Sequence, residues 1–185
     1  DDVNVRRALS LAIDNEAIAL SIGQGVAIPM KGWFPSSDPR AVDWLVFDPA
    51  AAEATLESAG WLRDGDGARM KDGVELTAIF YCYSDMGEGV STAAVDMATK
   101  VGFSASVQRM ETYADIQPVQ SVDGGIYTVY TESYGLNGDP VGTMRNVIDS
   151  SYTTPGYPDW IEIVDPILSS TDDAEISAAL IAGQQ

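Results

Sequence analysis

Between Val74 and Arg109 the hydrophobic period of the sequence changes twice, and this pattern limits the possible folds more than any other feature. From Val74 to Tyr83 successive residues alternate between two faces, as in a strand that is covered on at least one side. Apolar residues at helical spacing follow from Val90 to Val101, and Phe103 to Arg109 has the pattern of a second strand. A strand, a helix and a strand with short links form a βαβ unit, in which the strands are parallel. The sequence therefore predicts an α/β fold.

Further helices and strands extend this unit. Asp14 and Asp48 carry side chains that cap helix N-termini, Pro49 suits a first helical turn, and Gly60 suits the left-handed position after a helix. Helices are predicted over residues 5–13, 15–22, 49–59, 90–101 and 113–121 and in the tail from 160, and strands over 68–70 and 126–131. We expect one mixed β-sheet flanked by helices.

Composition excludes several classes of partner. The chain has 185 residues, which suits one domain or one lobe, and 28 acidic and 10 basic residues give it a net charge of −18. Such a surface repels phosphate backbones and anionic lipids, so we expect no nucleic acid as a partner. The single cysteine, Cys82, rules out an internal disulfide and is predicted to be a core residue.

The sequence offers little that could catalyse a reaction. It has no histidine, which excludes Ser-His-Asp and Cys-His arrangements and imidazole metal sites. It has no Walker loop and no glycine-rich dinucleotide fingerprint, so we predict no cofactor, no metal and no catalytic residue. A carboxylate-dependent hydrolase is the alternative of another class, because 28 acidic residues supply many carboxylate pairs.

The connection that follows the strand at 126–131 is the best candidate for a binding site. It carries Tyr134 and the turn Asn137-Gly138, and Asp139-Pro140 then opens a new helix. In α/β sheets ligands collect beyond the carboxyl ends of strands, beside helix N-termini. We therefore place the candidate site at Tyr134 to Asp139. An ordinary strand-to-helix connection with Tyr134 packed in the core is equally compatible with these residues.

Five blocks of sequence occur in an order that is known from one protein family. The blocks are VNVRRALSLAIDNEAIA (Val3 to Ala19), FDPAAAEATLESAGW (Phe47 to Trp61), DGDGARMKDGVEL (Asp64 to Leu76), KVGFSASVQRME (Lys100 to Glu111) and the Gly-Asp-Pro of Gly138 to Pro140. Together they resemble family 5 of the extracellular solute-binding proteins, the peptide- and nickel-binding components of ABC importers. The part from Ser151 onward matches less well.

The resemblance implies a two-lobed periplasmic-binding-protein architecture of type II, which closes on its ligand. It implies that residues 1–185 are a single lobe, the carboxy-terminal one, of a larger protein that is truncated at both ends here. The implied partners are a small-molecule or peptide ligand, the permease and ATPase subunits, and the missing amino-terminal lobe of the same chain. The implied location is extracytoplasmic, either periplasmic or as a cell-surface lipoprotein, and the implied role is not enzymatic.

The resemblance also implies which residues contact the ligand. In peptide-binding members an Asp in the loop before Asp-Pro holds the amino terminus of the peptide, but Leu136 stands at that position here. The loop length is closer to the nickel-binding pattern aromatic-Gly-x-x-x-Asp-Pro, which puts Tyr134 at the aromatic position. Arg145 could pair with a chelator carboxylate, or it could be a solvated helix charge. The predicted ligand-binding residues are Tyr134, Leu136, Asn137, Gly138, Asp139 and Arg145.

Several ligands remain open at this point. An oligopeptide is the leading expectation, a nickel ion or nickel chelate is the alternative within the family, and a sugar stacked on Tyr134 is a third. A regulatory sensor that binds a ligand without transporting it would use the same fold.

Overall fold

A computed structural model of the chain describes residues 2–24, 26–35, 37–63, 65, 67–116, 126–131, 162–163, 165–167 and 169–184. The chain divides into two compact units, one made of residues 1–29 and 45–132 and the other of residues 30–44 and 133–185. The prediction of a single lobe over 1–185 stays a prediction. No helix among the described residues is long and apolar enough to cross a membrane.

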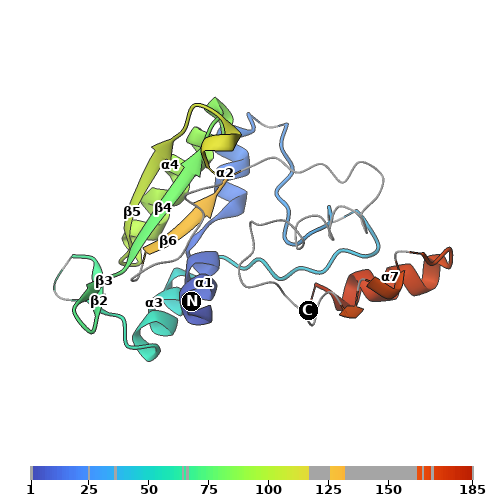
Figure 1. Ribbon diagram of the computed structural model, residues 1–185, viewed down its shortest axis with the longest axis horizontal. Coiled ribbons are helices and arrows are strands. Elements are labelled where there is room, and N and C mark those ends of the chain that lie inside the picture. Colours follow the sequence, from blue (N-terminus) through green and yellow to red (C-terminus); the bar gives the residue numbers. More distant parts are fainter. Residues whose placement is uncertain are drawn as a thin grey trace. The chain divides into compact units, whose positions relative to one another are not determined.

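The first unit contains most of the regular structure (Figure 1). Its elements are α1 (Val3–Ala12), α2 (Asn15–Ile22), α3 (Pro49–Ser58), β1 (Leu62–Arg63), β2 (Arg69–Lys71), β3 (Val74–Glu75), β4 (Thr77–Cys82), α4 (Asp85–Lys100), β5 (Ser104–Arg109), the 3-10 turn η1 (Tyr113–Asp115) and β6 (Ile126–Tyr130). The predicted α/β class is confirmed. The helix predicted over 113–121 is a 3-10 turn as far as Asp115, and residues 117–121 lie outside the described part.

The described strands form two sheets, so the expectation of one mixed sheet is wrong for this part of the chain. One sheet is antiparallel in the order β1-β2-β3, and the other is parallel in the order β5-β4-β6. The sequence predicted one strand from Val74 to Tyr83, but this stretch is interrupted at Leu76. Leu76 is fully buried, its N–H donates to the Arg69 carbonyl and its own carbonyl accepts from Ser104 N–H. The alternation continues across Leu76 because the backbone stays extended there while its partners change.

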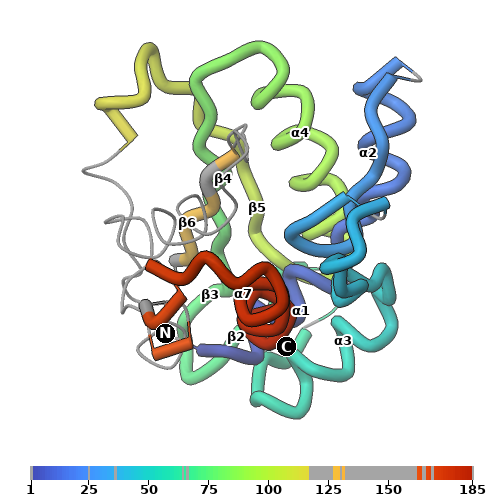
Figure 2. The backbone as a smooth tube through the Cα atoms, turned by 90° about the vertical axis from the view of Figure 1, so that its right-hand side faces the viewer, coloured from blue at the N-terminus to red at the C-terminus, as the bar shows by residue number. Residues whose placement is uncertain are grey.

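Side-chain caps begin the helices where the sequence predicted them. Asp14 accepts a hydrogen bond from the backbone N–H of Ala17, and Asp48 accepts one from Ala51, each at 2.9 Å. The helix α4 packs on β4 and β5, and α2 lies beside α4 (Figures 1 and 2). The parallel pairing of β4 and β5 through α4 confirms the predicted βαβ unit.

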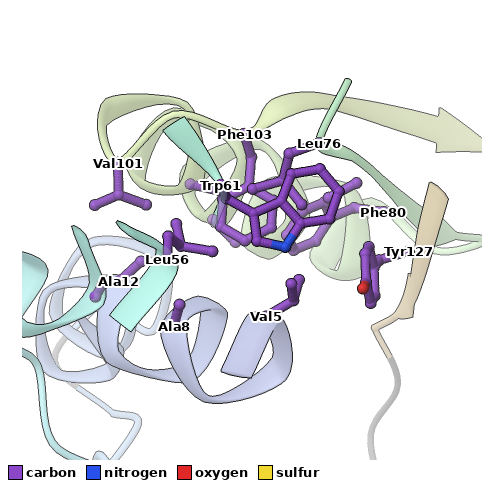
Figure 3. Close-up of a cluster of buried hydrophobic side chains, with 14 of the residues drawn as sticks. Val5, Ala8, Ala12, Leu56, Trp61, Leu76, Phe80, Val101, Phe103 and Tyr127 are labelled. Carbon is purple, nitrogen blue, oxygen red and sulfur yellow. The ribbon is translucent and has the colours of Figure 1, made fainter. Parts of the chain in front are cut away.

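One hydrophobic core lies among α1, α3, α4 and the parallel sheet. Figure 3 shows the Trp61 indole among side chains from these elements, including Val5 of α1, Leu56 of α3, Phe80 of β4 and Tyr127 of β6. Cys82 is fully buried, as predicted.

A buried arginine joins the hairpin sheet to this core. The Arg69 side chain is 1% exposed; its Nε donates to the Val101 carbonyl at 2.8 Å and its Nη1 to the Trp61 carbonyl at 3.0 Å. Gly102 has a φ of +103°, and a Cβ on it would lie 2.7 Å from Cγ of Arg69. Glycine is therefore required at position 102 both for its backbone conformation and for the close approach of Arg69.

The second unit has a smaller core of its own. Phe34, Ile167 of the 3-10 turn η3 (Asp165–Ile167) and Leu180 of α7 (Asp173–Ala182) are buried together. The Arg40 guanidinium lies 4.9 Å from the centroid of the Phe34 ring. In the described part of the helical tail predicted from residue 160, residues 162–163 are helical, Asp165–Ile167 is a 3-10 turn, and α7 begins at Asp173, where Asp172 caps it.

Candidate functional site

The carboxyl ends of the three parallel strands lie level with one another. Cys82 at the end of β4 pairs with Arg109 at the end of β5, and Tyr81 pairs with Tyr130 at the end of β6. The ladder continues one step further on each side, because Met110 N–H donates to the Cys82 carbonyl at 2.8 Å and Thr131 N–H to the Tyr81 carbonyl at 3.1 Å. We call residues Cys82–Ser84, Arg109–Met110 and Tyr130–Thr131 the carboxyl edge. This is the side of an open parallel sheet on which ligands generally bind.

The first turn of α4 closes tightly over this edge. Ser84 caps the helix by accepting a hydrogen bond from Gly87 N–H at 3.1 Å. Gly87 is buried, and a Cβ on it would lie 3.0 Å from Ser84 Oγ, 3.3 Å from Cys82 Cβ and 3.5 Å from the Thr131 carbonyl oxygen. The ends of β4 and β6 are thus held against one side of the helix N-terminus.

A polar pair of one buried and one half-buried residue joins α4 to the edge. Ser91 of α4 is fully buried, and its hydroxyl lies 2.8 Å from the hydroxyl of Thr131. Cys82 lies close by, and burial, followed by the charge of Glu88, raises the pKa of its thiol. Cys82 is therefore a neutral packing residue at neutral pH and not a thiolate ligand.

The charges at the edge are largely paired among themselves. Arg109 Nη2 lies 2.7 Å from Asp85 Oδ1, and Arg109 Nη1 lies 2.5 Å from Glu88 Oε2. The hydrogen bond that Arg109 donates to Glu88, followed by the one it donates to Asp85, raises the pKa of Arg109, which stays charged. Asp85 and Glu88 already complement the positive end of the α4 dipole, so this N-terminus is not an open anion site. The two carboxylates and one guanidinium leave one net negative charge here.

Two tyrosines add aromatic surface beside the edge. Tyr83 follows β4 directly and meets Tyr113 of η1 edge to face, with ring centroids 6.2 Å apart. Both side chains are half-buried. Rings with hydroxyl groups can pack against apolar parts of a ligand and hydrogen-bond to its polar parts.

All six predicted site residues lie outside the described part of the chain: Tyr134, Leu136, Asn137, Gly138, Asp139 and Arg145. The structure does describe Thr131, three residues before Tyr134, and places it at the carboxyl edge. Sequence analysis did not identify Tyr83, Ser84, Ser91 or Arg109. The predicted parallel pairing was a signal that could have found Tyr83, Ser84 and Arg109, because parallel strands end on the same side.

No metal site accompanies these groups in the part of the chain that the structure describes. There, no cluster of three or more His, Cys, Asp or Glu side chains is arranged to hold a metal ion.

Comparison with known proteins identifies the family. Residues 1–155 match the family model described as bacterial extracellular solute-binding proteins, family 5 Middle. The chain belongs to family 5 of the bacterial extracellular solute-binding proteins. The resemblance found in the five sequence blocks is thereby confirmed, and so is the predicted extracytoplasmic location, because proteins of this family are periplasmic or lie at the cell surface.

Two similar proteins, and one solved structure described after them, show how much of a longer protein this chain represents. It is 30% identical to Protein XP55 of Streptomyces lividans over 204 residues, which cover 98% of this chain and 36% of XP55. It is 27% identical to a putative ABC transporter peptide-binding protein of Brucella ovis over 113 residues, covering 60% of this chain and 20% of that protein.

Among solved structures, NikZ from Campylobacter jejuni in complex with Ni(L-His) matches with a TM-score of 0.78 and 20% identity, covering 97% of this chain and 38% of NikZ. The chain therefore spans little more than a third of XP55 and of NikZ, and it has the fold of the corresponding part.

Proposed function

We propose that this chain is part of the substrate-binding component of an ABC importer, which captures a small solute outside the cytoplasmic membrane and delivers it to the permease. The observation that carries this proposal is the family match over residues 1–155. Because the chain spans 36% of XP55, we propose that it forms one lobe of a larger receptor and that an amino-terminal lobe, a permease and an ATPase are its partners.

We propose that the ligand binds at the carboxyl edge and at the segment that follows β6. The proposed contacts in that segment are Tyr134, Leu136, Asn137, Gly138, Asp139 and Arg145. Support comes from Thr131, because the chain enters this segment at the edge where Tyr83 and the α4 N-terminus also lie. Parallel sheets bind ligands on this side.

An oligopeptide is the ligand that we propose. The Brucella ovis relative is named as a peptide-binding protein. The described charges agree, because Asp85 and Glu88 outnumber Arg109, and the exposed Glu111 and Asp115 follow β5. An edge with excess negative charge favours the free amino group of a peptide over an anionic chelate.

A nickel chelate is the second candidate. NikZ, which has the same fold, was solved in complex with Ni(L-His). The spacing from Tyr134 to Asp139 fits the nickel-binding pattern, and Arg145 would pair with a chelator carboxylate. We propose no catalytic role, because solute binding accounts for the family match and the chain has no histidine.

Native mass spectrometry tests this proposal. The natural protein that carries this chain would be purified gently from rich medium and sprayed under non-denaturing conditions. A heterogeneous set of added masses in the peptide range would support the oligopeptide receptor, and a single adduct with a nickel isotope pattern would support the chelate. Steady turnover of peptides or glycosides without retention of any ligand would contradict both and favour a hydrolase.

A further inference from the structure

Arg109 carries the only positive charge among the residues that form the carboxyl edge and the first turn of α4. Its Nη2 lies 2.7 Å from Asp85 Oδ1 and its Nη1 lies 2.5 Å from Glu88 Oε2. One guanidinium at the end of β5 therefore bridges two carboxylates from the first turn of α4. It cancels the charge of one of them and leaves the charge of the other.

This bridge is open to solvent and contributes little to holding the fold together. The side chains of Arg109 and Glu88 are 43% and 46% exposed, and that of Asp85 is 95% exposed. Exposed ion pairs add little to the stability of a folded chain. Charges on a surface that faces a ligand do act on the ligand, because they favour groups of one sign over groups of the other.

We propose that Arg109 is a specificity-determining residue of the carboxyl edge. By cancelling one of the two carboxylates, it keeps the charge preference of the edge weak, so that the edge accepts a neutral peptide group as well as a free amino group. Without Arg109, Asp85 and Glu88 would act together and favour positive groups much more strongly. The inference rests on the proposed oligopeptide function and narrows its ligand class to short peptides of varied charge.

Two peptides that differ only at their ends measure this preference. Tri-alanine amide carries a free amino group, whereas N-acetyl-tri-alanine carries a free carboxylate and no amino group. Calorimetry would give the affinity of the natural protein for each peptide after its retained ligand has been removed by unfolding and refolding. The ratio of the two affinities reports the charge preference, because a general loss of folding or binding cancels in the ratio.

Three variants separate the charge of Arg109 from its shape and from the net charge of the protein. Arg109→Gln removes the charge, and Arg109→Lys keeps it. Arg63→Gln is the matched control, because Arg63 also pairs with a carboxylate, that of Glu53 at 3.1 Å, and donates to the Lys100 carbonyl at the other end of α4. The helix from Glu88 to Lys100 is about 18 Å long, which is roughly two Debye lengths at physiological salt.

We expect Arg109→Gln to raise the affinity for the amide relative to the acetylated peptide by about threefold to tenfold in about 20 mM salt. This rise should shrink in about 0.5 M salt, because salt screens the exposed charges. Arg109→Lys should keep the ratio of the wild type. Arg63→Gln should change the ratio by less than about twofold.

Two failures are distinguishable. If Arg109→Gln leaves the ratio unchanged or lowers it, or if Arg63→Gln or Arg109→Lys shifts it as much, the inference is overturned, while binding of the peptides by the wild type still supports the proposed function. If the wild type binds neither peptide and retains no peptide in native mass spectrometry, the oligopeptide proposal is overturned, and the inference is overturned with it.

Discussion

Replacing Arg69 by methionine should destabilise the first unit strongly. The guanidinium is 1% exposed and donates to two carbonyls, those of Val101 at 2.8 Å and Trp61 at 3.0 Å, and it also bonds to Glu57 at 3.3 Å. Methionine preserves much of the aliphatic stem but leaves both carbonyls without this donor. Hydrogen bonds to charged groups contribute about 1.5–3 kcal/mol each, and part of this is offset because the charge no longer has to be buried. We expect a loss of about 2–4 kcal/mol in the free energy of unfolding.

Arg63→Met is the matched control for this prediction. Arg63 also bonds to a carbonyl, that of Lys100 at 2.8 Å, and lies 3.1 Å from Glu53, but its side chain is 27% exposed. Water can replace these bonds, so we expect a loss of no more than about 1 kcal/mol. Urea unfolding followed by circular dichroism measures both variants against wild type. Equal losses in the two variants, or a loss below about 1 kcal/mol for Arg69→Met, would refute the reasoning.

Three further predictions follow from the described contacts and from the proposed site. Gly102→Ala should lower the free energy of unfolding by about 2 kcal/mol or more, because the new Cβ meets both a positive φ and a close contact. Gly73→Ala should lower it by only about 1 kcal/mol, because Gly73 has a φ of +80° but open space around it. Urea unfolding of both variants measures the difference. Hydrogen bonds from Arg40 hold the pKa of Asp38 at about 2, below its ordinary 3.8. The ionised Asp38 carboxylate therefore stabilises the folded state fully above about pH 4, and this contribution is lost as the pH falls through about 2. Asp38→Asn should therefore be less stable than wild type near neutral pH and should converge with it at about pH 2 in urea titrations; a constant difference would contradict this assignment. Tyr134→Ala should weaken ligand binding in the natural protein by about 1–3 kcal/mol, measured by calorimetry, and an unchanged affinity with intact folding would remove Tyr134 from the site.

The sequence predicted local structure well where a single physical signal decides it. Asp14 and Asp48 each lie before a helix and cap it, because an acidic side chain at that position satisfies free N–H groups of the first turn. Gly60 and Gly102 have positive φ values after helices, as the pattern of C-terminal glycines suggests. The change from alternating to helical spacing predicted the parallel pairing of β4 and β5.

Long-range partners could not be read from the same patterns. The alternation from Val74 to Tyr83 does not reveal that Leu76 separates two sheets, because a strand keeps its alternation when its hydrogen-bonding partners change. Nor does the sequence reveal that Arg69 is buried, since an arginine in a short hairpin strand is usually exposed.

The candidate site was only partly predictable for a similar reason. The segment after β6 was predicted as a site from its helix-start signals and from the family resemblance, and it stays a prediction. Tyr83 and Arg109 come to the same edge as the end of β6 only through strand register, with Cys82 opposite Arg109 and Tyr81 opposite Tyr130. The hydrogen bond between Ser91 and Thr131 joins residues 40 positions apart and leaves no periodic signal in the sequence.

Hydrogen exchange of the natural protein before and after removal of its bound ligand tests the central claim most directly. The loaded protein as purified would be compared with the same protein stripped by unfolding and refolding. If the ligand binds at the carboxyl edge, residues 83–87 and 132–139 exchange more slowly in the loaded form, while the hairpin from Leu62 to Glu75, near the other end of β4, stays unchanged. Protection confined to that hairpin or to other regions, with both edge segments unaffected, would contradict the account.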